Sequence, residues 1–122
     1  MAQASSALRR VNPRYTFFAD AEATLYDGTL VLGQLSELSC RGCYIDTLEP
    51  IPIGTEFDLR ICDGMTSCEL QGKAIYMHSG SGLGIFGIGV VFGDVALGQR
   101  SAIDAWLSEL AGNKSTPALN ET

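Results

Sequence analysis

The sequence predicts a mainly β domain, a small antiparallel barrel or sandwich of about five or six strands, followed by one C-terminal helix. Three observations favour this fold class. Apolar and polar residues alternate with a period of two between residues 15 and 92, turn residues separate the alternating segments, and from residue 95 the apolar positions recur with helical spacing. A chain of 122 residues is one domain by length and can bury a sizeable core.

The first two expected strands form a hairpin, and a short third strand follows them. In the segment 19–25, ADAEATL, the odd positions are apolar and the even positions are polar, which is typical of a half-buried strand. The dipeptide DG at 27–28 supplies a turn into a second strand over 30–38. A third strand is expected over 43–47, and it ends before the proline-containing segment 50–54, because proline has no N–H to donate to a central ladder.

The next hairpin can be aligned residue by residue. If Gly64 and Met65 form a two-residue turn, apolar residues face each other on one side of the hairpin and opposite charges meet on the other. The expected partners are Leu59 with Leu70, Ile61 with Cys68, Arg60 with Glu69, and Glu56 with Lys73. A register shifted by one residue would lose both the apolar pairs and the pairs of opposite charge, so the alignment is a specific prediction.

A last strand is expected over 83–92, with bulky apolar side chains on one face and glycines, including Gly87 and Gly89, on the other. Glycines inside a strand let something approach it closely or let it bend. The segment 82–87 also satisfies the pattern G-x-G-x-x-G, but a β-rich strand continues from it where a dinucleotide site requires a helix. We therefore interpret these glycines as a loop and part of a strand.

The apolar period becomes helical at the C-terminus. Four apolar residues at i, i+3, i+4 and i+7 predict a helix over about 95–111 that packs on the sheet: Ile103, Trp106, Leu107 and Leu110. Asp94 is a suitable N-cap, and Gly112 is a suitable C-terminal stop. We interpret Trp106 as a core residue, and we expect residues 112–122 to form a disordered polar tail.

Charge is unevenly distributed along the chain. The net charge is −6, yet Arg9, Arg10 and Arg14 lie in a first segment, 1–14, that contains no acidic residue. We therefore expect a basic N-terminal arm on an acidic domain, 15–111. An acidic domain argues against binding to a nucleic-acid polymer, whose affinity depends on neutralising many phosphates, but it is compatible with a small anion held by the arm.

The sequence predicts a cytoplasmic protein without a membrane span. No apolar run reaches the length of about 18 residues that a spanning helix needs, and the N-terminal charges follow a weakly apolar stretch, which is the reverse of a secretory signal. Thiols stay reduced in the cytoplasm, so the four cysteines are not expected to form a disulfide framework.

The cysteines and the single histidine give weak support to metal binding or catalysis. Cys40 and Cys43 have C-x-x-C spacing, but five residues separate Cys62 from Cys68, which is the wrong spacing for the second half of a zinc site. His78 alone offers no catalytic group with both a base and an orienting partner. We expect neither an enzyme nor a metal cofactor, and a zinc or dithiol protein remains only as a third hypothesis.

Two other features point to a nucleotide. Arg10 and Arg14 are four residues apart, with Arg9 beside them, and guanidinium groups suit phosphates and the O6/N7 edge of guanine. The alternative for this arm is a solvated charged terminus. No phosphate-binding P-loop sequence accompanies the arginines, so binding without hydrolysis is the simpler hypothesis.

The second feature is the segment 37–43, ELSCRGC. Glu37 can accept hydrogen bonds from the N1–H and amino group of guanine, Ser39 offers a hydroxyl, and Gly42 lets the backbone come close to a ligand. Together with the arginines, these residues make a plausible site for a guanine nucleotide.

In this order and spacing, R-x-x-x-R over 10–14, E-x-S-x-x-G over 37–42 and GIGVVF over 87–92 resemble the PilZ domain, and the resemblance spans about residues 8–111. It implies a six-stranded antiparallel split β-barrel with one C-terminal helix, which binds the bacterial second messenger cyclic di-GMP. It also implies ligand-binding roles for a set of six residues: Arg9, Arg10, Arg14, Glu37, Ser39 and Gly42. The family has Asp or Asn where this chain has Glu37, which is one methylene longer.

The leading hypothesis is therefore a single-domain bacterial receptor or adaptor, a monomer or homodimer, that binds cyclic di-GMP through the arginine arm and the 37–42 turn. Ordering of the arm would then signal to an unidentified downstream protein in trans. The alternative is a degenerate adaptor of the same fold that binds a protein and little or no nucleotide, for which Glu37 is the best support.

Overall fold

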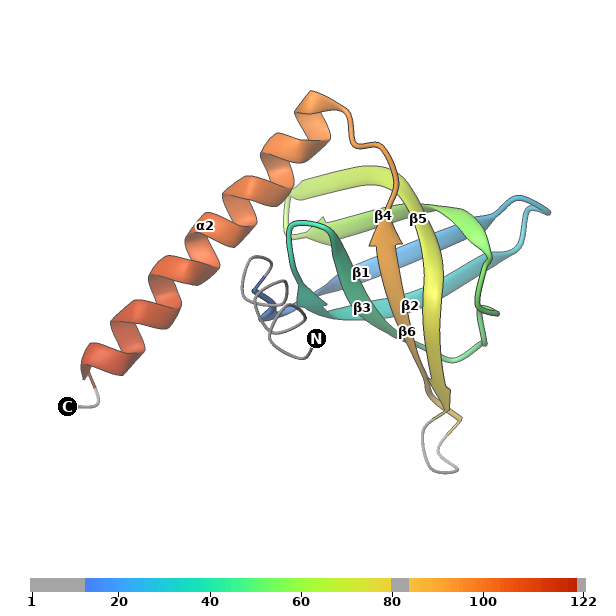
Figure 1. Cartoon of the computed structure of the whole chain (residues 1–122), viewed down its shortest axis with the longest axis horizontal. Coiled ribbons are helices and arrows are strands. Elements are labelled where there is room, and N and C mark those ends of the chain that lie inside the picture. The colour runs from blue at the N-terminus through green and yellow to red at the C-terminus, as the bar shows by residue number, and fades with distance from the viewer. Residues whose placement is uncertain (1–12, 80–83, 121–122) are drawn as a thin grey trace, which may run out of the picture.

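The computed structural model describes residues 13–79 and 84–120, with side chains described up to residue 112. Within these ranges the strands close into an antiparallel barrel in the order β1-β2-β3-β6-β5-β4, and helix α2 lies on one side of it (Figure 1). The predicted six-stranded antiparallel barrel with one C-terminal helix is confirmed. The elements are β1 (Tyr15–Leu25), β2 (Leu30–Leu38), β3 (Gly42–Thr47), β4 (Glu56–Asp63), β5 (Thr66–Ser79), β6 (Phe86–Phe92) and α2 (Leu97–Asn120).

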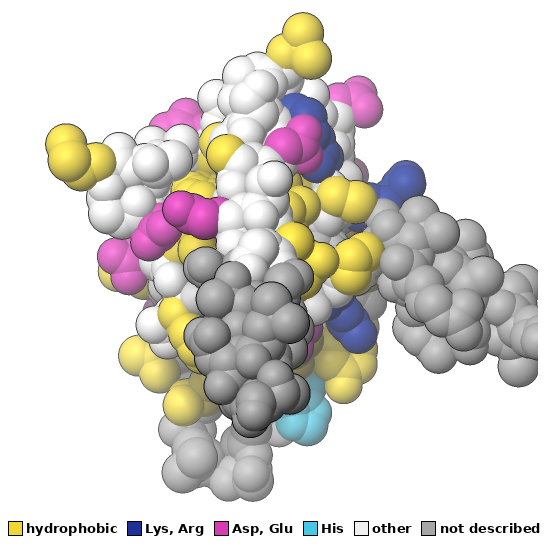
Figure 2. Space-filling view, turned by 90° about the vertical axis from the view of Figure 1, so that its left-hand side faces the viewer, with side chains coloured by type: hydrophobic (Ala, Val, Ile, Leu, Met, Phe, Trp, Pro, Cys, Tyr) yellow, Lys and Arg dark blue, Asp and Glu magenta, His cyan; other side chains and the backbone are white. Residues whose placement is uncertain are grey.

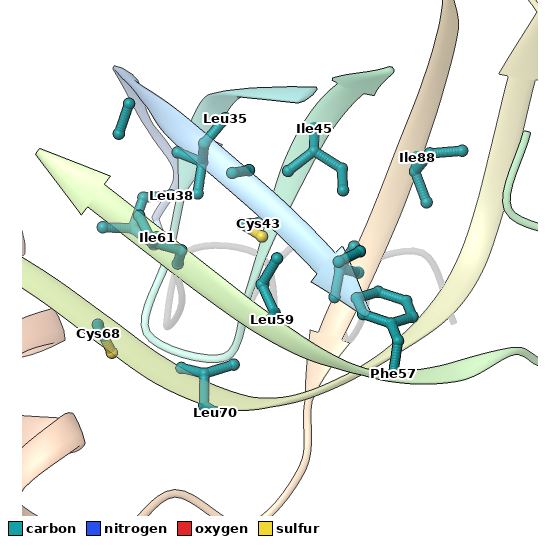
Figure 3. Close-up of a cluster of buried hydrophobic side chains, with 14 of the residues drawn as sticks. Leu35, Leu38, Cys43, Ile45, Phe57, Leu59, Ile61, Cys68, Leu70 and Ile88 are labelled. Atoms are coloured by element: carbon teal, nitrogen blue, oxygen red, sulfur yellow. The ribbon is translucent and has the colours of Figure 1, made fainter. Parts of the chain in front are cut away.

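The alternation of apolar residues fills the barrel interior. In β4, Phe57, Leu59 and Ile61 are buried while the residues between them face outward. Leu35 of β2 and Ile45 of β3 meet them inside the barrel, among the aliphatic side chains of the core (Figure 3). Burial of one such side chain stabilises the fold by about 1.5–3 kcal/mol, so a few alternating strands are enough to decide which face of each strand points inward.

The β4–β5 hairpin has the predicted register. Leu59 lies opposite Leu70, Ile61 opposite Cys68, Arg60 opposite Glu69 and Glu56 opposite Lys73. On the outer face the Nε of Arg60 lies 3.8 Å from Oε2 of Glu69. The register is therefore fixed mainly by the buried pairs, because an exposed ion pair contributes less than about 1 kcal/mol.

The helix starts later than the sequence predicts. α2 begins at Leu97, and the N–H of Arg100 donates to the carbonyl of Ala96 at 2.8 Å, which is the first intrahelical bond that an N-cap residue accepts. Ala96 is therefore the N-cap, and the expectation for Asp94 is wrong.

The predicted stop of the helix is also wrong. α2 continues to Asn120 through Gly112, which does not adopt the positive φ by which a glycine ends a helix. The helix therefore includes most of the segment 112–122, which the sequence predicts to be a disordered tail, and residues 121–122 lie outside the described part.

The first half of α2 packs against the barrel. Ile103 and Trp106 are buried, and the ring centroid of Trp106 lies 5.3 Å from that of Phe17 in β1, so Trp106 is a core residue as predicted. At the start of the helix, Oε1 of Gln99 accepts a hydrogen bond of 2.6 Å from the N–H of Glu69 in β5. Figure 2 views this side of the molecule and shows hydrophobic side chains on both flanks of the helix.

Among the described residues, no helix is both long enough and apolar enough to cross a membrane.

Candidate ligand-binding site

The pairing of β1 with β2 brings Arg14 of the first predicted motif close to the second motif. Tyr15 lies opposite Leu38 and Thr16 opposite Glu37, so Arg14, which immediately precedes β1, lies beside the end of β2. The Nε of Arg14 is 3.9 Å from Oε1 of Glu37. Both side chains remain open to solvent, with 67% of Arg14 and 45% of Glu37 exposed, so each is available to a ligand. Arg9 and Arg10 lie outside the described residues.

Ser39 holds the turn between β2 and β3. Its N–H donates to the carbonyl of Gly42 at 2.9 Å, and its hydroxyl lies 3.2 Å from both the carbonyl oxygen and the N–H of Gly42. A further N–H, that of Arg41, donates to the same hydroxyl at 3.4 Å. Ser39 is buried, so the contacts of its hydroxyl lie within the turn, and the turn presents the neighbouring side chains.

Gly42 is required by the close approach of two strands. It is buried opposite Val91 in β6, and a Cβ at this position would overlap the carbonyl oxygen of Val90. The structure thus gives Gly42 a role in packing β3 against β6. The sequence predicts a different role for the same glycine, the close approach of a ligand to the backbone.

A cavity of about 450 Å³ opens over this turn. Its lining combines the two motifs with side chains from three further strands, including Arg14, Glu37, Arg41, Tyr44, Ile75 and Tyr76. Five of these six carry a charge or a phenol, and the rest of the lining includes backbone and apolar residues of β3 and β6. The cavity can therefore offer cationic, anionic and aromatic contacts to one small molecule.

Three of the charged or phenolic lining residues were not predicted as site residues: Arg41, Tyr44 and Tyr76. Arg41 lies inside the E-x-S-x-x-G segment at an unconstrained position and is exposed. Tyr44 and Tyr76 lie on different strands, and each is opposite Gly89 of β6. The only sequence feature that pointed to the tyrosines was the pair of glycines in the last strand, Gly87 and Gly89. They indicated that another group approaches this strand closely, but not which group.

The two tyrosine rings contact each other at the cavity. The ring centroids of Tyr44 and Tyr76 are 6.4 Å apart, with a tilt of 38°. Burial raises the pKa of the Tyr44 phenol, and the neighbouring Tyr76, Asp46 and Glu37 raise it further. The phenol therefore stays uncharged near neutral pH and can act as a hydrogen-bond donor.

The PilZ domain family model matches residues 8–109 of this chain. The chain belongs to the PilZ domain family. A comparison with curated protein sequences gives no match.

Solved structures similar to this PilZ domain share its fold at low sequence identity. The PilZ domain of YcgR from Escherichia coli with c-di-GMP has a TM-score of 0.72 and 15% identity, over 90% of this chain and 97% of that chain. The MrkH–c-di-GMP complex from K. pneumonia has a TM-score of 0.76 and 15% identity, over 89% and 55%. The inhibitor of motility MotI/DgrA from Bacillus subtilis has a TM-score of 0.72 and 13% identity, over 87% and 53%. The chain spans about half the length of the last two proteins.

The cysteines of this PilZ domain do not resemble a redox or zinc site. Cys43 and Cys68 are buried among aliphatic side chains of the core (Figure 3), and burial raises the pKa of both thiols. Reactive or metal-binding cysteines need the opposite shift, because the thiolate is the active form. The four cysteines form no disulfide, and the described residues contain no group of three or more potential metal ligands.

Proposed function

We propose that this PilZ domain is a receptor for cyclic di-GMP. The observation that carries the proposal is the contact of Arg14 with Glu37 at the rim of the 450 Å³ cavity, whose volume lies in the range of about 300–1,000 Å³ of small-molecule sites. A guanidinium suits the phosphates of the ligand, and a carboxylate suits the two donors on the edge of guanine. Structures of YcgR and MrkH, which share the fold, contain this ligand.

Each motif residue has a distinct role in this proposal. Arg14 binds a phosphate, joined by Arg9 and Arg10 from the arm, and Glu37 accepts hydrogen bonds from N1–H and the amino group of one guanine. Ser39 and Gly42 contribute by holding the turn that presents Glu37 and by bringing the backbone close to the ligand.

The contact between Arg14 and Glu37 suits an exchange of partners. An ion pair this exposed contributes at most about 1 kcal/mol. A phosphate of the ligand can therefore replace Glu37 as the partner of Arg14 at little cost. Glu37 is then free to accept from the guanine.

We propose a binding role without catalysis, carried out in the bacterial cytoplasm by a monomer or homodimer. Binding of cyclic di-GMP orders the arginine arm over the cavity, and a downstream protein recognises the liganded surface. Ordering of a segment by an anionic ligand is a known form of molecular switch, which supports this mechanism.

Isothermal titration calorimetry of the whole chain with cyclic di-GMP tests the proposal. The wild type should give saturable heat, and Arg14→Ala should bind at least tenfold more weakly, since hydrogen bonds to charged groups contribute about 1.5–3 kcal/mol. Arg60→Ala is the matched control, because Arg60 is a similarly exposed ion-paired arginine that does not line this cavity. It should bind like the wild type.

Two outcomes would contradict the proposal. Absence of heat from the wild type at high micromolar ligand would exclude the receptor and favour an adaptor that binds only protein. Equal affinity of Arg14→Ala and Arg60→Ala would exclude this cavity as the site.

A further inference from the structure

A row of side chains crosses the outer face of four adjacent strands. Glu37 of β2 lies opposite Tyr44 of β3, Tyr44 lies opposite Gly89 of β6, and Gly89 lies opposite Tyr76 of β5. The residues on either side of Tyr44 in β3 are buried, so the ring points away from the core. The row therefore places a carboxylate, a ring, a strand glycine and a second ring in sequence along the cavity.

Two glycines of β6 make room for the tyrosines. A Cβ at Gly87 would overlap the hydroxyl and ring edge of Tyr44, and a Cβ at Gly89 would lie 3.0 Å from the Cβ of Tyr76. Tyr44 is opposite Gly89 yet reaches Gly87 with its hydroxyl end, so its ring lies along the surface of β6. The hydroxyl end of the ring therefore lies over Gly87, and Tyr44 lines the cavity.

We infer that Tyr44 and Tyr76 form an aromatic platform on which one guanine base of the ligand stacks, while Glu37 binds the edge of the same base. The inference rests on the proposed function and assigns two binding residues that neither motif contains. It accounts for the glycine at position 89, because a Cβ there would lie 3.0 Å from the Cβ of Tyr76 and would crowd the platform.

The position of Glu37 gives the platform its preference for guanine. Directly opposite residues of an antiparallel pair have Cβ atoms about 4.5–5.5 Å apart, so the carboxylate lies at the border of the Tyr44 ring. A base stacked on that ring presents its edge to the carboxylate. Guanine offers two neighbouring donors there, N1–H and the amino group, whereas adenine offers a donor beside an acceptor. Stacking supplies affinity for any base, and Glu37 selects guanine.

Binding of cyclic di-GMP to tyrosine variants of the whole chain tests the platform. Tyr44→Leu and Tyr76→Leu keep apolar bulk and lose the ring, and each should weaken binding roughly 5- to 150-fold, the range found when single stacking rings are removed. Tyr44→Phe and Tyr76→Phe keep the ring and should stay within about twofold of the wild type, if stacking and not the hydroxyl is responsible. Tyr26→Leu is the control, because Tyr26 is an exposed tyrosine outside the cavity.

A second measurement does not depend on the folding of the variants. The H8 proton of a guanine stacked on a ring moves upfield in the NMR spectrum, so wild-type protein should shift the H8 resonance of cyclic di-GMP. Leucine variants that bind as tightly as the wild type, or an H8 resonance that stays in place at saturation, would exclude the platform and leave the receptor standing. A wild type that binds no cyclic di-GMP would exclude both the platform and the receptor. An equal loss of affinity in the Phe and Leu variants would assign the contact with the ligand to the tyrosine hydroxyls and would exclude stacking.

Discussion

Single residues of the 37–42 turn have separable roles. Glu37 lines the cavity and contacts Arg14. The hydroxyl of Ser39 holds the backbone of the turn, and the bare Cα of Gly42 lets the turn pack against β6. Substitutions at Glu37 should therefore change affinity without changing stability. Substitutions at Gly42 should change stability first.

Gly42→Ala should destabilise the barrel. The added Cβ overlaps a backbone carbonyl of β6, which cannot rotate away as a side chain could. Overpacking of this kind costs roughly 1–3 kcal/mol, so the free energy of unfolding in a urea titration should fall by that amount. Gly98→Ala is the control, since it adds the same methyl in the first turn of α2 with nothing within 4 Å, and it should be neutral or stabilising. Equal stability of the two variants would disprove this role for Gly42.

Glu37→Gln should weaken binding of cyclic di-GMP. The carboxylate can accept from both donors on the guanine edge, whereas an amide replaces one acceptor with a donor that faces a donor. A lost bidentate base contact costs roughly 1–3 kcal/mol, which calorimetry would record as an affinity about 5- to 150-fold lower. Tighter binding would mean that the carboxylate mainly repels the phosphates of the ligand, and the assigned contact with guanine would be wrong.

At the scale of elements, β1 connects the cavity to the helix. Arg14 directly precedes β1, a register shift between Thr16 and Ala19 follows, and Phe17 within that irregular stretch contacts Trp106 of α2. A change in the backbone at Arg14 can therefore reach the helix through one aromatic contact. If cyclic di-GMP binds at Arg14, this contact connects its site to the helix.

Trp106 should report ligand binding through its fluorescence. It is the only tryptophan in the chain, and its ring lies 5.3 Å from Phe17 between centroids. Cyclic di-GMP should change the emission of the wild type with the midpoint found by calorimetry. Phe17→Leu should keep the affinity and reduce the emission change. Emission that stays constant at saturating ligand would show that β1 does not transmit binding to α2.

An element could be predicted from the sequence where residues close together in the chain determine it. The β4–β5 register followed from the sequence because a two-residue turn and both faces of one hairpin constrain it. The end of α2 did not, since Gly112 can stop a helix or continue it and its φ is set by its surroundings. The shifts of register in β1 and β5 were likewise invisible, because an extra residue in a strand leaves little trace in its pattern of polarity.

At the scale of the whole molecule, closure of the barrel assembles the site. The sequence was sufficient to propose Arg14, Glu37 and the turn as site residues, because each belongs to a short motif. Tyr44 and Tyr76 could not be found in this way, since they meet only when β6 inserts between β3 and β5. The part of the site that depends on long-range strand order is therefore the part that required the structure.

We propose above all that cyclic di-GMP binds in the cavity over the 37–42 turn. The most direct test is a titration followed by two-dimensional amide NMR spectra of the whole chain. We expect saturable shifts concentrated in residues 37–44 and 87–91, with little change in the β4–β5 turn at 62–67, which lies outside this cavity. Spectra that do not change with ligand, or shifts centred on 62–67, would contradict it.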